Sequence, residues 1–93
     1  MYMAVMTLTF RLEGCHSLKG KRSRLSGIRE KYGRHSHLAV CESDYQDDHQ
    51  LSEWTFVALG SRRDFVASTL ADLEAKLDDN LDAQIIGSDL EWI

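Results

Sequence analysis

The stretch "YMAVMTLTFRL", residues 2–12, decides the fold because every second residue along it is apolar. A period of two predicts a β-strand with one buried face. That face consists of Tyr2, Ala4, Met6, Leu8, Phe10 and Leu12. The opposite face begins with Met3 and Val5 and turns polar at Thr7. We therefore expect the strand to bury one face in the core and to leave a second face that is half apolar.

A helix is predicted directly after this strand. Ser17 is placed to cap it, because a serine hydroxyl accepts a hydrogen bond from a backbone N–H of the first turn. The apolar residues of the helix recur at helical spacings and form a narrow stripe. They are Leu18, Leu25, Ile28 and Tyr32. Gly33 is expected to end the helix after roughly sixteen residues, since glycine readily takes the left-handed conformation that closes many helices.

The rest of the chain divides into three strands and a second helix. In chain order we expect a strand at 37–43, a polar loop at 44–50, a strand at 53–61, a helix ending near 80 and a strand at 83–93. Ser61 and Asp64 resemble a capping box at the start of the second helix. Gly87 interrupts the final apolar segment, which predicts a bulge or bend there.

The resulting order, β-α-β-β-α-β, predicts an α+β fold of the ferredoxin-like class. We expect one domain over residues 1–93, a four-stranded antiparallel sheet and two helices on one face. The helices are expected to pack on Trp54 and Phe56, not on the alternate set that includes Val57. The open sheet face then lacks the aromatic pair on which single-stranded RNA stacks its bases. Any RNA contact is therefore expected on the helix side.

Charge is distributed unevenly along the chain. Residues 1–37 hold eight Lys/Arg and two acids, whereas residues 38–93 hold three Lys/Arg and thirteen acids, for a net charge of −4. This asymmetry predicts a partner for the basic part, either nucleic acid or the acidic part of another copy. The residues expected to bind nucleic acid or another anion are Lys19, Lys21, Arg22 and Arg24, with Arg29 secondary. The alternative is a solvated helix face whose long side chains cover the core.

An acidic segment runs from the second strand into the loop. Glu42, Asp44 and Asp47 are candidates for docking onto a basic helix, within one chain or between two; the alternative is a solvated loop. The half-apolar strand face also predicts a homodimer, because soluble monomers rarely leave such a patch uncovered.

Location follows from what the sequence lacks. No window approaches the ~20 apolar residues that cross a bilayer, so no membrane contact is expected. The N-terminus has the pattern of a strand and not of a signal peptide. Cys15 and Cys41 show no recognisable spacing, which indicates two free thiols in a reducing cytoplasm.

No catalytic or metal-binding pattern is complete. Cys15 and His16 are adjacent, which points their side chains apart in an extended segment, and no third residue orients the imidazole. Neither the His35/His37 pair nor the cluster at residues 47–49 has the spacing of a structural zinc site. We therefore expect no enzyme activity, no cofactor, no metal and no small-molecule substrate.

Two segments carry a family likeness. "HSLKGKR" at residues 16–22 and "VCESDYQD" at 40–47 resemble the YlxP-like family of small bacterial proteins, a domain of unknown function. The resemblance covers essentially the whole chain and implies the ferredoxin-like fold and a bacterial cytoplasmic location. Genes of the family often lie beside ribosome-assembly and translation-initiation genes, which implies an RNA-related setting and no established activity. One position departs: the family usually has glutamate where this chain has Gly20. The expected function is an RNA- or ribosome-associated binding module, with a homo-oligomeric protein–protein module as the alternative.

Overall fold

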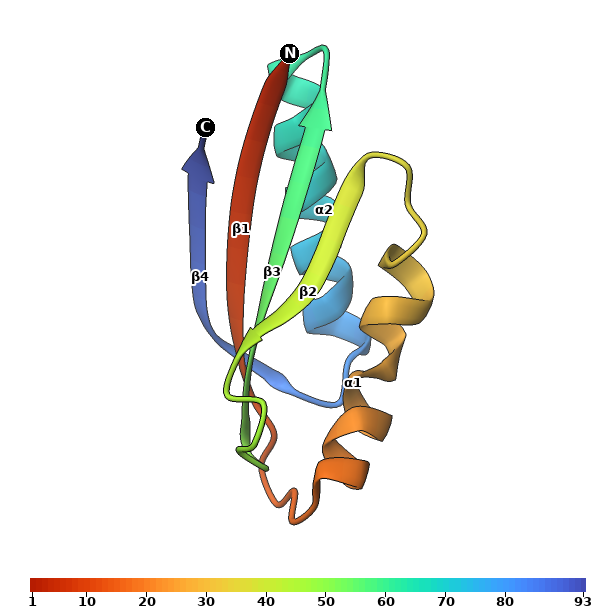
Figure 1. The fold of residues 1–93 in the computed structure, drawn as a ribbon, viewed down its shortest axis with the longest axis vertical. Coiled ribbons are helices and arrows are strands. Elements are labelled where there is room, and N and C mark those ends of the chain that lie inside the picture. Colours follow the sequence, from red (N-terminus) through yellow and green to blue (C-terminus); the bar gives the residue numbers. More distant parts are fainter.

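The computed structural model describes residues 1–93 and confirms the predicted order of elements. They are β1 (Tyr2–Arg11), α1 (Leu18–Tyr32), β2 (Leu38–Asp44), β3 (Leu51–Gly60), α2 (Arg63–Asn80) and β4 (Gln84–Trp92). The strands form one antiparallel sheet in the order β2-β3-β1-β4, with both helices on the same face (Figure 1). This is the ferredoxin-like α+β fold. The molecule is elongated, 42 × 21 × 21 Å, along the direction of the strands.

The two central strands supply most of the core. On β1 the predicted alternation is confirmed from Ala4 onward: Ala4, Met6, Leu8 and Phe10 are buried, while the residues between them are only half-buried. Tyr2, which was predicted on the same buried face, is exposed. Across the sheet, β3 turns Ser52, Trp54, Phe56 and Ala58 toward the helices. The aromatic set of β3 therefore faces the helices, as predicted. β3 begins at Leu51, two residues earlier than predicted, because Arg11 at the end of β1 pairs with Leu51.

Helix α1 begins and ends at the predicted residues. Ser17 is its N-cap, and the Ser17 hydroxyl accepts a hydrogen bond of 2.9 Å from the Gly20 N–H. Gly33 is the C-cap, but its φ of −66° is right-handed, so the expected left-handed ending is wrong. Glycine is needed there for a different reason. A Cβ at this position would lie 2.5 Å from the Arg29 carbonyl oxygen.

The predicted capping box of α2 is also wrong. The N-cap residue is Arg62, whose side chain forms no capping hydrogen bond. Since α2 starts at Arg63, Ser61 lies one residue too early to reach the free N–H groups. Asp64 instead accepts hydrogen bonds from the Arg62 guanidinium, the shorter being 2.7 Å. Like α1, α2 is not both long and apolar enough to cross a membrane.

Strand β4 contains the predicted irregularity. Thr9 pairs with Gly87 and Phe10 with Ile85, so Ile86 is an extra residue on β4. A Cβ at Gly87 would meet the Thr9 side chain at 3.4 Å, which is a tight but ordinary contact. The bulge leaves Ile86 exposed near the end of the sheet where β1 meets the turn between β2 and β3.

The first turn of α1 generates a stability prediction. Gly20 occupies the third helical position after the Ser17 cap, where glutamate would complete a capping box. Gly20→Glu should raise the free energy of unfolding by about 1 kcal/mol, because it also removes the helix penalty of glycine. Thermal melting followed by circular dichroism measures the change.

Gly20→Ala is the matched control, because it removes the glycine penalty without adding a carboxylate. We expect alanine to give part of the gain and glutamate the whole. The new Cβ would lie 3.1 Å from the Ser17 hydroxyl oxygen, so the serine must shift slightly. A lower melting point for both variants would show that the Ser17 cap cannot make this shift.

Candidate functional site

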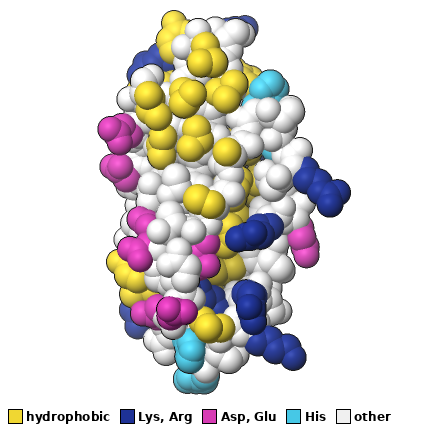
Figure 2. Space-filling model, in the orientation of Figure 1, with side chains coloured by type: hydrophobic (Ala, Val, Ile, Leu, Met, Phe, Trp, Pro, Cys, Tyr) yellow, Lys and Arg dark blue, Asp and Glu magenta, His cyan; other side chains and the backbone are white.

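The seven Lys and Arg side chains between residues 19 and 34, on α1 and just after it, divide into two groups. Lys21 and Arg24 form hydrogen bonds and ion pairs inside the chain. The other five are exposed and form neither, and they are Lys19, Arg22, Arg29, Lys31 and Arg34. Figure 2 shows Lys and Arg side chains along the side of the molecule where α1 lies. Only the second group is free to bind an external anion.

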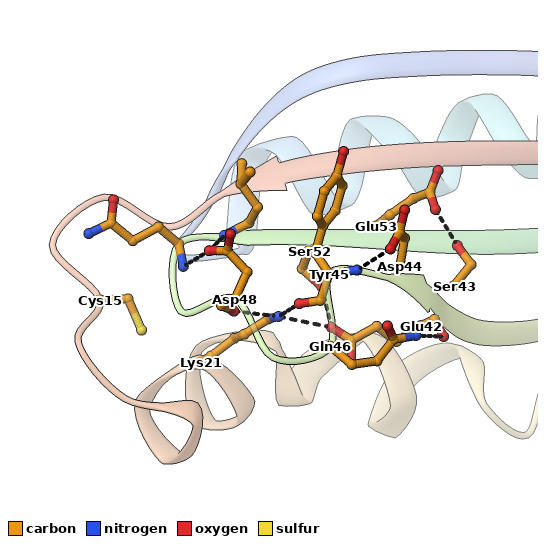
Figure 3. Close-up of polar contacts among 12 residues, drawn as sticks. Cys15, Lys21, Glu42, Ser43, Asp44, Tyr45, Gln46, Asp48, Ser52 and Glu53 are labelled. Carbon is orange, nitrogen blue, oxygen red and sulfur yellow. Dashed lines mark hydrogen bonds and ion pairs between the residues drawn. The ribbon is translucent and has the colours of Figure 1, made fainter.

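The expectation that Lys21 binds an external anion is wrong, because its side chain is only 4% exposed. Its ammonium donates hydrogen bonds to the carbonyl oxygens of Tyr45, at 2.6 Å, and Asp48, at 2.8 Å. The Glu42 carboxylate forms an ion pair with it at 3.3 Å (Figure 3). These three acceptors match the three donors of the ammonium. Lys21 therefore fastens the first turns of α1 to the connection between β2 and β3.

The Lys21 network extends into that connection. Glu42 also accepts a hydrogen bond of 2.6 Å from the buried Ser52 hydroxyl. Tyr45 has a φ of 63°, a left-handed conformation that is uncommon outside glycine. The Asp48 carboxylate accepts hydrogen bonds from the N–H groups of Gln50 and Leu51. The loop is thus held by its own polar groups and by one lysine from α1.

Arg24 is also occupied within the chain. Its Nε donates to the Asp82 carbonyl oxygen at 2.8 Å and its Nη1 to the Glu13 carbonyl oxygen at 3.0 Å. The Asp82 carboxylate lies 3.2 Å from Nε as an ion pair. Arg24 thereby ties α1 to the segments that precede α1 and follow α2. Arg24 is only partly buried, so its contact with an external phosphate stays a prediction, but its Nε and Nη1 atoms are already used within the chain.

The predicted acidic residues do different things. Glu42 turns inward to Lys21, so it docks onto the basic helix of its own chain. Asp44 accepts a hydrogen bond of 2.7 Å from the Tyr45 N–H and shapes the turn. Asp47 is exposed and forms no ion pair or hydrogen bond. Of the three, only Asp47 has a carboxylate with no partner in the chain.

A groove separates α1 from the sheet. Its volume is about 600 Å³, and it opens between α1 and the strands β2 and β3. Leu18 and Leu25 give it an apolar wall, Arg22 and Arg29 lie on the α1 side, and Trp54 contributes from β3. This size falls within the usual range for ligand pockets, about 300–1,000 Å³. The groove therefore combines free cations with an apolar interior.

Trp54 lacks a hydrogen-bond partner for its indole N–H. The residue is 4% exposed, and Nε1 is buried with no acceptor. A buried donor without a partner costs about 1–3 kcal/mol, so such groups are rare. The Arg29 guanidinium lies 5.3 Å from the centroid of the Trp54 ring, as a cation–π contact. Sequence reasoning assigned Trp54 to the core alone, because nothing in the sequence shows whether its N–H finds an acceptor.

A second buried polar group lies at the other end of α1. The Tyr32 hydroxyl has no hydrogen-bond partner. Burial raises the pKa of Tyr32 above its usual value, because the phenolate is poorly solvated there. Tyr32 lines a smaller cavity of about 170 Å³ with residues of α2. One lysine, Lys76 of α2, lines this cavity together with the acid Asp72, which makes it a weaker candidate for anion binding than the groove.

The cysteines and histidines do not form a site. Cys15 is buried with its thiol 3.5 Å from the Ser17 carbonyl oxygen, and Cys41 is exposed on β2. The rings of His35 and His37 lie 5.8 Å apart and are tilted. No group of three or more His, Cys, Asp or Glu side chains gathers where it could hold a metal ion.

The role assigned to Lys21 can be tested by its effect on stability. Lys21→Met keeps the aliphatic stem and removes the ammonium, which leaves the Glu42 carboxylate and two carbonyl oxygens without their donor. We expect the free energy of unfolding to fall by about 3 kcal/mol. Urea denaturation followed by circular dichroism measures this loss.

Lys19→Met is the matched control, because Lys19 lies two residues away, is exposed and has no partner. It should change the free energy of unfolding by no more than about 0.5 kcal/mol. Equal denaturation midpoints for the two variants would contradict the anchoring role of Lys21.

Comparison with known proteins identifies the family. A family model described as "Protein of unknown function (DUF503)" matches residues 3–90, which reach from β1 to β4 and include the groove. No match was found among curated proteins. Because the match covers nearly the whole chain, the protein belongs to the DUF503 family of proteins of unknown function.

Proposed function

We propose that this protein is a non-enzymatic, cytoplasmic module that binds single-stranded RNA through α1. The observation that carries the proposal is the set of five exposed cations on or next to α1 that form no hydrogen bond or ion pair within the chain. Lys19, Arg22 and Arg29 are the central members, and Lys31 and Arg34 extend the set past the end of the helix. Cations left free along one helix are suited to successive phosphates, which attract them without regard to sequence.

The fold leaves this surface electropositive although the chain carries a net charge of −4. Glu30 is the one acid within α1, and the first turn has none. The helix dipole adds partial positive charge at that end. The acids concentrate beyond residue 37, so the two signs occupy different parts of the sequence. Attraction to phosphate is therefore local, while the net charge opposes approach from a distance.

Two further features support the proposal. The resemblance of residues 16–22 and 40–47 to YlxP-like proteins implies a setting in ribosome assembly. Cys15 and Cys41 are free thiols, as expected of a protein in a reducing compartment.

The open sheet face carries no aromatic stacking pair, because Trp54 and Phe56 are turned toward the helices. RNA would therefore meet α1 and not the sheet.

The test is fluorescence anisotropy with labelled single-stranded fragments of ribosomal RNA. With three phosphate contacts and a slope near −0.7 for each, the affinity should fall about twentyfold between 50 and 200 mM salt. Arg22→Ala combined with Arg29→Ala should weaken binding at least about tenfold, because two of the contacts are lost.

The control is Arg63→Ala combined with Lys76→Ala, which removes the same charge from α2. It should leave the affinity within about twofold, since these residues lie on the other helix. The proposal is overturned if the unmodified protein shows no binding at 50 mM salt. It is also overturned if both double variants weaken binding equally.

A second candidate function is self-association through the open sheet face. Met3 pairs with Leu59 and Val5 with Val57 across the two central strands. These two adjacent pairs form an apolar patch, which Figure 2 shows on the upper part of this face. A second copy with the same patch would cover it in a twofold-symmetric dimer.

Light scattering at micromolar concentration tests this candidate. The dimer predicts about twice the chain mass of 10.6 kDa. Val5→Lys should shift the protein toward monomer, because it places a charge in the patch. Thr7→Lys is the control, since Thr7 lies on the same face of β1 beyond the patch. A monomeric unmodified protein would remove this function.

A further inference from the structure

Trp54 lines the groove between α1 and the sheet, and its indole N–H has no hydrogen-bond acceptor within the chain. Trp54 and Glu42 are direct neighbours across β2 and β3, so Glu42 is the acceptor nearest in the sheet register. Its Oε2 atom is already used by the Lys21 ammonium and the Ser52 hydroxyl. The indole N–H of Trp54 is buried and forms no hydrogen bond with Glu42 or with any other acceptor in the chain. An acceptor from outside the chain would satisfy it.

The side chain that covers Trp54 is free to move. Arg29 lies over the indole ring but forms no ion pair or hydrogen bond that would hold its guanidinium in place. A long side chain without an anchor changes rotamer readily, on the picosecond to nanosecond timescale. A ligand can therefore displace the guanidinium from the ring and still contact it. The groove is open to a ligand that brings its own acceptor.

The shape of the lining favours a flat, partly apolar ligand over a bare phosphate. Leu18, Leu25 and the Trp54 ring offer an apolar interior, which a phosphate would enter only by losing its water. A nucleobase has apolar faces, and its edges carry acceptors and donors. Glu30 and Gln46 also line the groove and supply further polar groups for such an edge.

We propose that the groove receives one unstacked base of single-stranded RNA, with the Trp54 indole N–H donating a hydrogen bond to an acceptor on the base edge. Arg29 stacks its guanidinium on the base, and Arg22 contacts the adjoining phosphate. Stacking on arginine planes and reading of splayed bases are common in RNA recognition. This inference rests on the proposed RNA-binding function and adds to it a base-binding site.

The test uses the indole N–H signal in the proton–nitrogen NMR spectrum, which reports on the donor directly. The chain has two tryptophans, and Trp92 lies on β4, at the opposite edge of the sheet from β2. Trp92→Phe assigns the two signals. Addition of a single-stranded hexaribonucleotide should shift the Trp54 signal and leave the Trp92 signal in place. An abasic oligomer of the same length, which keeps only sugar and phosphate, should shift neither.

Affinity gives the second measurement. Trp54→Phe keeps an aromatic side chain and removes the donor, so it should weaken binding of the hexaribonucleotide about fivefold. It should not change binding of the abasic oligomer, and Trp92→Phe should change neither. If Trp54→Phe fails to fold, the NMR shift in the unmodified protein still decides the question.

The outcomes separate the two proposals. If RNA binds with the expected salt dependence but the Trp54 signal stays in place, the base site is wrong and the binding through α1 remains. If the base-bearing and abasic oligomers bind equally well, the base site is also wrong. If no RNA binds at all, both proposals fall together.

Discussion

The ammonium of Lys21 is the contact on which the arrangement of this molecule depends. It is buried where the first turns of α1 meet the connection between β2 and β3. It binds the carbonyl oxygens of Tyr45 and Asp48, which lie 24 and 27 positions further along the chain. A buried cation is tolerated only when acceptors replace its water, and here one carboxylate and two carbonyl oxygens do so. The geometry of the loop and the placement of the helix are consequently set together.

The groove lies beside this contact, because Lys21 and Glu42 are among its lining residues. Lys21 and Arg24 fasten α1 at the end near its N-cap, to the loop after β2 and to the segment after α2. The apolar stripe of α1 is narrow, with Leu25, Ile28 and Tyr32 as its buried members. Between this stripe and β2 the helix does not close fully onto the sheet, and the groove of about 600 Å³ remains. The groove therefore runs along α1 from Leu18 to Glu30, past the end that these two residues fasten.

The cations of α1 fall into two groups, those that hold the structure together and those that are free for binding. Lys21 and Arg24 are used inside the chain, whereas Arg22 and Arg29 lie beside the groove without a hydrogen bond or ion pair. Neighbouring residues of one helix point in directions about 100° apart, so Lys21 and Arg22 meet different surroundings. A basic cluster in the sequence therefore combines two roles, one in stability and one that we propose for binding.

Much of the fold could be predicted from the sequence, because the signals are local. Alternating apolar residues in β1, the Ser17 cap and the irregularity at Gly87 each depend on neighbouring residues alone. Where local signals were ambiguous, the predictions failed. Ser61 resembled a cap, but the helix begins at Arg63, and Gly33 closes α1 without a left-handed conformation.

The sequence by itself determined the elements, their order and the basic character of α1. Only the tertiary structure decided which cations are free. Lys21 and Lys19 look alike in the sequence, and what distinguishes them is whether Glu42 and the carbonyl oxygens of a distant loop arrive beside the ammonium. The unpartnered N–H of Trp54 is likewise a property of three strands and a helix together. Burial and hydrogen bonding of a side chain depend on contacts between residues far apart in the chain. The local periodicity of the sequence does not predict these contacts.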